Sequence, residues 1–248
     1  MSVFEKSADL LRRLGGKDPS PKTAAIIVSA GNSLRMGIKG SKQFLEICGK
    51  PVLAHTLIAF EYAKSIDEII VVARREDIKT VWELSKVYHI EKLTVVTHGG
   101  DTRAASVRNG FEKISGKTRF VAIHDGARCL IQPNEIDRVC RMAYRHRAAT
   151  AACPVTDTVK LAKRGHFIEK TLDRNRVFLV QTPQVFSADL YRAALSMVSE
   201  DYTDDNQLME KIKYPVKLVD FGKDNLKITH PDDVARAEFI LKQREMCK

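Results

Sequence analysis

The sequence predicts an α/β fold with a doubly wound, mostly parallel sheet and an inserted β-arm, and three observations support this prediction. Apolar, strand-like runs alternate with helix-spaced segments over most of residues 23–248. The first run, AAIIVSA at 24–30, is almost wholly apolar, which is typical of a strand covered on both faces. A chain of 248 residues can also bury a substantial core without disulfides. We therefore expect one large domain over residues 23–248.

The alternation of strands and helices is clearest before residue 155. Pro51 suits the first position of a helix, because the N–H that proline lacks has no partner there. The predicted elements are, in order, helix 51–65, strand 68–75, helix 76–88, strand 92–100, helix 101–114, strand 119–127, helix 133–147 and strand 149–155. Repeated β–α units of this kind predict that successive strands run parallel.

The pattern changes after Pro154. Residues 156–186 alternate weakly and turn at KRGH, which predicts a β-arm at about 154–180 followed by a return strand. The final helix has Pro231 and two acidic residues in its first turn. The remaining predicted elements are helices 187–200 and 204–212, strands 216–221 and 226–229, and helix 230–246.

Residues 1–22 form an N-terminal appendage and linker in this interpretation. The segment 3–14 has the spacing of a short amphipathic helix, and GGKDPSP then interrupts it. It lacks the continuous apolar segment of a secretory signal, and no run approaches the ~18 apolar residues of a membrane span. The five cysteines are odd in number and include no CxxC pair. We expect a reduced, cytoplasmic protein without a membrane partner.

The charge of the chain points to anionic partners. Lys and Arg number 41 against 31 Asp and Glu, a net charge of +10. This balance does not distinguish phosphorylated small molecules from nucleic acid. Trp82 and the other aromatic residues look like core residues, and none forms a stacking stripe beside basic residues, which argues against nucleic acid.

Polar groups gather where the predicted strands end. Three predicted strands end in such groups: Ala30-Gly31, Gly99-Gly100-Asp101 and His124-Asp125-Gly126. Ligands of open α/β sheets bind beyond the carboxyl ends of the strands. We expect the three ends to face one crevice. The loop after the first strand carries Arg35, Lys39 and Lys42, which suits a polyanionic ligand. A plain surface loop is about equally compatible with it.

Individual residues at these ends have two interpretations each. Asp125 is either a Mg²⁺ ligand, since carboxylate oxygens suit that ion, or a helix cap, and its position favours the ligand. Asp101, Arg103 and Ser106 begin a helix, where they either bind an anion or serve in ordinary capping by Asp101. His124 is expected to be a packed, hydrogen-bonded histidine rather than a base.

Six segments together resemble one family. In order they are SAGNSLRMG…SKQF, GGDTRAASV, HDGAR, PVTDTVK, DRNRVFLVQTPQVF and DNLKITHPDD. This order resembles that of the 2-C-methyl-D-erythritol 4-phosphate cytidylyltransferases, over Thr23 to Leu241. The resemblance implies a Rossmann-like nucleotidyltransferase sheet, a homodimer joined through the β-arm, and Mg²⁺ as cofactor. It implies transfer of the cytidylyl group of CTP to methylerythritol phosphate in non-mevalonate isoprenoid biosynthesis.

The resemblance also implies roles at the CTP end of the site. Arg35, Lys42 and Lys227 match the basic residues at the reacting phosphates, and Asp125 matches the aspartate associated with Mg²⁺. The residues that match the binding of CTP are Ala30, Gly31, Asn32 and Ser33 in the loop, and Gly100, Asp101, Arg103 and Ser106 around cytosine and ribose.

Methylerythritol phosphate would have its own contacts. The residues that match these contacts are Arg128, Thr158, Arg174 and Thr182, and the resemblance implies that some of them reach across the dimer from the arm. It also implies that Arg174 and Lys227 position the substrate phosphate. The chain departs from the family pattern at Gly126, where Ala is usual, and at Cys129, where Pro is usual.

Two other functions stay open at this point. A cytidylyltransferase for another polyol phosphate, such as ribitol 5-phosphate, would share the CTP half of the site. A basic nucleic-acid-binding protein without catalysis would instead show steep salt dependence and release no pyrophosphate.

Overall fold

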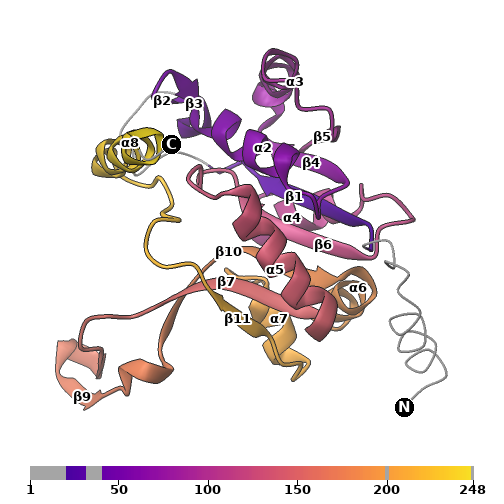
Figure 1. The fold of residues 1–248 in the computed structure, drawn as a ribbon. Coiled ribbons are helices and arrows are strands. Elements are labelled where there is room, and N and C mark those ends of the chain that lie inside the picture. Colours follow the sequence, from indigo (N-terminus) through magenta and orange to yellow (C-terminus); the bar gives the residue numbers. More distant parts are fainter. Residues whose placement is uncertain (1–20, 32–40, 199–200, 247–248) are drawn as a thin grey trace, which may run out of the picture.

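A computed structural model describes residues 21–31, 41–198 and 201–246, which are built around one seven-stranded sheet (Figure 1). The strands lie in the order β11-β7-β10-β6-β1-β4-β5. Their bounds are β1 Thr23–Val28, β4 Glu68–Ala73, β5 Leu93–His98, β6 Phe120–Asp125, β7 Ala148–Pro154, β10 Phe178–Ser187 and β11 Lys217–Asp220. The predicted segment 3–14 lies outside the described residues.

The sheet is mostly parallel, as the sequence predicts. β1 pairs parallel with β4 and β6, β4 with β5, and β11 with β7, whereas β10 runs antiparallel to both of its neighbours. Ala24 to Ile27 in β1, an interior strand, are fully buried, which explains the continuous apolar run. Because β1, β5 and β6 run the same way, their carboxyl ends meet at one edge of the sheet.

Helices cover both faces of the sheet. Ala25 and Ile27 of β1 pack on the face that carries α2, α3 and α5, and Ile26 packs on the face with α4, α6 and α7. α8 closes a third, smaller core against β2 and residues 127–130. The helices are α2 Val52–Tyr62, α3 Ile78–Val87, α4 Arg103–Phe111, α5 Pro133–His146, α6 Ala188–Met197, α7 Asn206–Lys211 and α8 Pro231–Met246.

The predicted arm is a separate two-stranded sheet that stands clear of the body (Figure 1). β8 Lys160–Ala162 pairs antiparallel with β9 Ile168–Thr171, and the turn between them holds Gly165 at a φ of +78°. A positive φ favours glycine, so the KRGH turn was predictable from its composition. Phe167 and Ile168 are 75% and 67% exposed.

The remaining elements are short. They are the 3-10 turns η2 Lys42–Phe44, η3 Arg75–Asp77, η4 Arg164–His166 and η5 Arg174–Arg176, and the two-residue strands β2 Glu46–Ile47 and β3 Lys50–Pro51.

Three local predictions were wrong. Residues 226–229 form no strand, because their contacts lead out of the sheet: the N–H of Ile228 donates to the Ala127 carbonyl, and its side chain is buried below α8. Pro51 precedes α2 and pairs within β3 instead of occupying the first helical turn. Trp82 lies on the outer side of α3 with 36% exposure and is not a core residue.

Across the described part of the chain, no helix is both long enough and apolar enough to cross a bilayer.

Candidate active site

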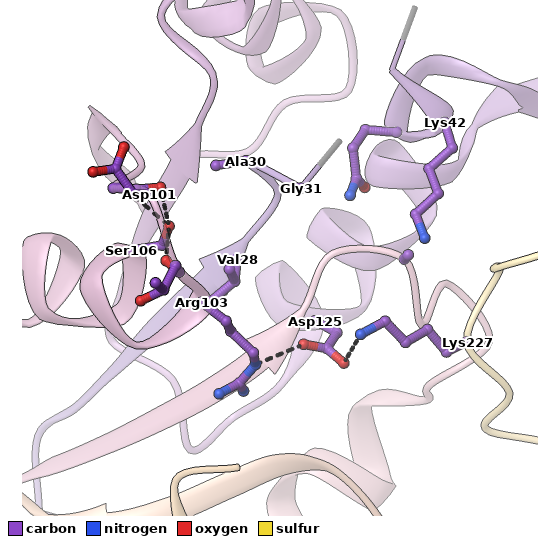
Figure 2. Close-up of a pocket in the computed structure, with 13 residues that line it drawn as sticks. Val28, Ala30, Gly31, Lys42, Asp101, Arg103, Ser106, Asp125 and Lys227 are labelled. Atoms are coloured by element: carbon purple, nitrogen blue, oxygen red, sulfur yellow. Dashed lines mark hydrogen bonds and ion pairs between the residues drawn. The ribbon is translucent and has the colours of Figure 1, made fainter. Parts of the chain in front are cut away.

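A pocket of about 430 Å³ opens at the carboxyl ends of β1, β5 and β6 (Figure 2). The three predicted strand ends therefore do face one crevice. Polar and charged side chains dominate its lining. The lining residues are Val28, Ala30, Gly31, Lys42, Gln43, Gly100, Asp101, Thr102, Arg103, Ser106, Asp125, Ala127 and Lys227.

One wall of the pocket is the turn from β5 into α4. Thr102, and not Asp101, is the residue that caps α4, because its Oγ1 accepts from the Ala105 N–H at 3.1 Å. Of the two interpretations of this helix start, capping by Asp101 is therefore wrong. Ser106 Oγ accepts from the Gly100 N–H at 3.1 Å and donates to the Thr102 carbonyl at 2.9 Å. These bonds hold the turn rigid and leave the Asp101 side chain on the pocket wall.

Glycine at position 99 permits this turn to lie against β1. A Cβ added there would come within 2.4 Å of the Ala30 Cβ, closer than real Cβ contacts allow. A similar approach occurs at Gly126, where a Cβ would lie 2.3 Å from Ser29 Oγ. Glycine at 126, in place of the alanine usual in the resembled family, therefore leaves room for Ser29.

Asp125 ends β6 at the pocket floor and is held by three cations. Its Oδ2 lies 2.8 Å from Lys227 Nζ and 3.7 Å from Arg128 Nε, and its Oδ1 lies 3.5 Å from Arg103 Nε. Burial opposes ionisation, but Lys227, Arg103 and Arg128 together lower the pKa of Asp125 below its ordinary value. The carboxylate is therefore charged at neutral pH, and its oxygens face cations rather than the N–H groups of a helix end.

Arg103 bridges Asp125 to a second carboxylate. Its Nη1 donates to Asp205 Oδ2 at 2.6 Å, and the Tyr191 hydroxyl donates to Asp205 Oδ1 at 2.6 Å. Burial lowers the pKa of Arg103 by itself, but the two carboxylates raise it above its ordinary value. Burial also raises the pKa of Asp205, while Arg103 opposes that shift.

Two lysines distant in sequence meet on the side of the pocket opposite Asp101 (Figure 2). Lys42 Nζ donates to the Ile228 carbonyl at 2.6 Å, which joins η2 to the segment that carries Lys227. The Lys227 side chain is 36% exposed and reaches Asp125 from that segment. The sequence-predicted Asn32, Ser33 and Arg35 lie outside the described residues.

Two predicted substrate contacts lie behind the pocket surface. Thr182 is 4% exposed, and its Oγ1 accepts from the Asp125 N–H at 3.1 Å and bonds His124 Nδ1 at 3.0 Å. Arg128 donates from Nη1 to the Asn225 carbonyl at 2.7 Å. The structure therefore places Thr182 and Arg128 as supports of Asp125 and does not bring either to the pocket lining.

The arm residues are also separate from the pocket within one chain. Thr158 is exposed, and Arg174 is exposed on η5, where Nη1 donates to the Thr156 carbonyl at 3.3 Å. Neither residue lines the pocket.

His124 is packed, as predicted. It is fully buried, its ring lies 4.9 Å from that of Phe60, and burial lowers its pKa to about 3. A neutral, buried imidazole of this kind has a structural role beside Asp125.

Sequence reasoning missed Asp205. The sequence pattern places it within a helix at 204–212, whereas the observed α7 begins one residue after it. The run of acidic and amide residues TDDNQ was the available signal, because such residues favour helix starts. Nothing local indicates that Asp205 pairs with Arg103, which lies 102 residues earlier.

The described residues contain no group of three or more His, Cys, Asp and Glu side chains that could hold a metal ion. Asp125 is a single carboxylate at the pocket floor, and a Mg²⁺ ion at this place would require further oxygens from a bound substrate or water.

Comparison with known proteins identifies the family. The family model "IspD: 2-C-methyl-D-erythritol 4-phosphate cytidylyltransferase" matches residues 23–243. A 2-C-methyl-D-erythritol 4-phosphate cytidylyltransferase from Dehalococcoides mccartyi is 42% identical over 222 residues, covering 90% of this chain and 97% of that protein. The enzyme of the same name from Syntrophus aciditrophicus is 40% identical, covering 91% and 98%.

Solved structures agree with the sequence comparisons. The 4-diphosphocytidyl-2C-methyl-D-erythritol synthase from Anaerococcus prevotii aligns with a TM-score of 0.80 at 29% identity, covering 90% of this chain and 97% of that one. The 2-C-methyl-D-erythritol 4-phosphate cytidylyltransferase from Thermus thermophilus aligns at 0.71 and 30% identity, covering 89% and 99%. The chain belongs to the 2-C-methyl-D-erythritol 4-phosphate cytidylyltransferase family.

Proposed function

We propose that this protein joins CTP and 2-C-methyl-D-erythritol 4-phosphate to give CDP-methylerythritol and pyrophosphate, a step of non-mevalonate isoprenoid biosynthesis. The observation that carries the proposal is that Lys42, Lys227 and Arg103 line one pocket together with Asp125, at the sheet edge of a chain from this family. Such a cationic pocket suits two phosphorylated substrates better than a neutral one.

The reaction needs charge neutralisation more than proton transfer. A phosphate oxygen of methylerythritol phosphate attacks the α-phosphorus of CTP in line; the new P–O bond forms as the bond to pyrophosphate breaks, and pyrophosphate takes the electron pair. The nucleophile is already an anion, so the buried, neutral His124 is not required as a base. Fixed cations stabilise the developing charge, and holding both reactants removes up to roughly 7–11 kcal/mol of entropic barrier.

The lining residues divide into two groups by position. We assign Ala30, Gly31, Gly100, Asp101, Arg103 and Ser106 to CTP, with Asn32 and Ser33 in the loop beyond the described residues. Lys42 and Lys227 lie across the pocket from Asp101 and would contact the reacting phosphates (Figure 2). Arg35 is proposed to join them from the same loop.

Asp125 fits a Mg²⁺ ion that arrives with CTP. It offers one hard carboxylate oxygen at the pocket floor, which is the number of protein ligands that a phosphate-bound Mg²⁺ often has. The ion would supply further positive charge at the phosphate oxygens. When no substrate is bound, Lys227, Arg103 and Arg128 balance the charge of Asp125.

The methylerythritol phosphate site is proposed to be completed by a second copy of the chain. Arg174 and Thr158 lie on or beside the projecting arm and do not reach the pocket of their own chain. The arm region also exposes Phe167, Ile168 and Leu179, the last at 60%, an apolar surface that a partner would cover. We infer a homodimer in which each arm brings Arg174 to the partner's pocket, where Arg128 and Thr182 support Asp125.

The proposal includes a cytoplasmic location and no nucleic-acid or membrane partner. The location is supported by the free thiols of the described residues, which suit a reducing compartment: Cys48, Cys129, Cys140 and Cys153.

A substrate panel tests the function. The purified protein is incubated with CTP, Mg²⁺ and, in separate reactions, methylerythritol phosphate or ribitol 5-phosphate, and the product is identified by mass. We expect CDP-methylerythritol and pyrophosphate. A product formed only from ribitol 5-phosphate would replace the proposed acceptor, and absence of any CDP product combined with salt-sensitive oligonucleotide binding would overturn the enzymatic assignment.

A further inference from the structure

Arg103 has an unequal pair of partners. Its Nη1 lies 2.6 Å from Asp205 Oδ2, whereas its Nε lies 3.5 Å from Asp125 Oδ1. Asp125 in turn has its closest cation in Lys227, at 2.8 Å. Each carboxylate therefore has one short cation partner, and Asp205 is the one that holds Arg103.

Asp205 is unusually well fixed for an acidic residue. It is fully buried beside the apolar cluster of α4, α6 and β10, and Tyr191, also fully buried, donates its hydroxyl to Oδ1. Its backbone N–H donates to Gln184 Oε1 at 3.0 Å, which ties the start of α7 to β10. The carboxylate thus has little freedom to move, and it imposes its position on the guanidinium.

Stability does not account well for such a pair. Taking a carboxylate and a guanidinium out of water costs about as much as their attraction returns, so replacing a buried ion pair by apolar residues is often neutral or favourable. A better reason for the Arg103–Asp205 ion pair is that it places a cation at a binding site. Arg103 lines the pocket, and its contacts with Asp125 and Asp205 use only part of the five N–H donors of a guanidinium.

We propose that Asp205 is a positioning residue for CTP binding, which holds the Arg103 guanidinium at the pocket floor and prevents it from closing onto Asp125. This inference rests on the CTP site proposed above. When the charge of Asp205 is removed, Asp125 is the remaining carboxylate partner of Arg103. Arg103 would then compete with Lys227 for Asp125 and would turn away from the nucleotide.

The test separates CTP binding from binding of the second substrate. Asp205→Asn keeps the size of the side chain but removes its charge, so Arg103 retains only a neutral acceptor at this position. We expect the KM for CTP, and the Kd from calorimetric titration with CTP and Mg²⁺, to rise about tenfold, the effect of about 1.4 kcal/mol. The KM for methylerythritol phosphate should stay within about twofold of its wild-type value.

Asp204→Asn is the matched control. Asp204 accepts from Gln184 Nε2 at 2.6 Å and from Asn206, but does not contact Arg103. The variant loses the same charge one residue away, and we expect its KM for CTP within about twofold of wild type. A tenfold rise in this control as well would overturn the inference, because the effect would then belong to the segment and not to the Arg103 contact.

A double-mutant cycle with Arg103→Gln tests the route of the effect. If Asp205 acts through Arg103, adding Asp205→Asn to Arg103→Gln should raise the KM for CTP no further. Fully additive effects, or an equal rise in both Michaelis constants for Asp205→Asn alone, would overturn the inference. If the inference is overturned while the wild type forms product in the same assays, the proposed function stands and only the positioning role fails. A wild type without product would reject both.

Tyr191→Phe keeps the inference testable if Asp205→Asn does not fold, as judged by circular dichroism. This variant removes the hydroxyl that steadies Asp205 Oδ1 and leaves the ion pair with Arg103 in place. We expect a rise of about threefold in the KM for CTP alone, the effect of about 0.7 kcal/mol, because the variant removes one hydrogen bond that orients Asp205 and leaves the ion pair with Arg103 in place. An unchanged KM for CTP in a folded Tyr191→Phe protein would count against the positioning role.

Discussion

Replacing Lys227 with alanine removes the cation closest to Asp125 and one of the two lysines at the proposed reacting phosphates. Lys227 Nζ lies 2.8 Å from Asp125 Oδ2, a Coulomb attraction of about 6 kcal/mol at an effective dielectric constant of about 20. The net contribution to folding is much smaller, because the Lys227 side chain is 36% exposed and Arg103 and Arg128 continue to balance the carboxylate. We expect Lys227→Ala to lose up to about 1 kcal/mol of stability and to melt up to about 2–4 °C lower.

The catalytic cost should be larger than the cost to stability. Loss of one pre-positioned charge at a site of developing negative charge lowers turnover by about 10²–10³-fold, or about 2.7–4 kcal/mol. The variant protein should nevertheless fold, because Lys227 lies in an irregular segment at the pocket rim and not in the apolar core.

Pyrophosphate release under saturating CTP and methylerythritol phosphate measures turnover, and circular dichroism with thermal melting measures the fold. Lys217→Ala is the matched control: it removes the same charge from an exposed position on β11, outside the pocket. The control should keep wild-type turnover. Turnover of Lys227→Ala within about threefold of wild type would refute the argument that this cation stabilises the reacting phosphates.

Three further predictions follow from the same geometry. Lys42→Ala should lower turnover by about 10²-fold or more in the pyrophosphate assay with an unchanged circular dichroism spectrum, and a near-normal rate would reject its assignment. Arg174→Ala should raise the KM for methylerythritol phosphate more than that for CTP, whereas equal changes in both would argue against the arm contact; sedimentation of the same variant checks that the dimer persists. Burial raises the pKa of the Cys129 thiol to about 12, so the folded state keeps a proton that the unfolded chain releases above about pH 9, and stability is lost as pH rises through that window. Cys129→Ala should therefore lose about 1.4 kcal/mol less stability than wild type between pH 8 and pH 10 in urea titrations, and an identical slope for both proteins would contradict this origin.

The regular elements of the sheet could be predicted because their signals are local. The sequences of β1, β4 and β6 are apolar runs, because both faces of an interior parallel strand are buried. Prediction failed where a tertiary contact outweighed a local pattern. Residues 226–229 alternate like a strand, yet the Ile228 side chain packs in the small core under α8 and Lys227 pairs with Asp125.

The positions of the site residues were only partly predictable. Asp125, Arg103 and Ser106 follow strands or begin a helix, so the topology of a parallel sheet brings them to one edge. The supporting role of Thr182 could not be predicted in this way, because it depends on a 3.1 Å contact with the Asp125 N–H from an antiparallel strand late in the chain. The sequence likewise carries no signal for how exposed a site residue is. The resemblance implies that Thr182 contacts the substrate, yet its side chain is 4% exposed.

By itself the sequence determined that strands and helices alternate, that the strands run mostly parallel, and that cations and Asp125 lie at the edge where ligands bind. The spacing of apolar side chains and the handedness of β–α units depend on short segments, so the local sequence is enough to predict them. Only the tertiary structure decided which partner each charged side chain has: Arg103 pairs with Asp205, Lys227 pairs with Asp125, and Lys42 donates to the Ile228 carbonyl. Ion pairs and hydrogen bonds act over 3–4 Å, and that proximity arises between residues 100 or more positions apart only when the whole chain has folded.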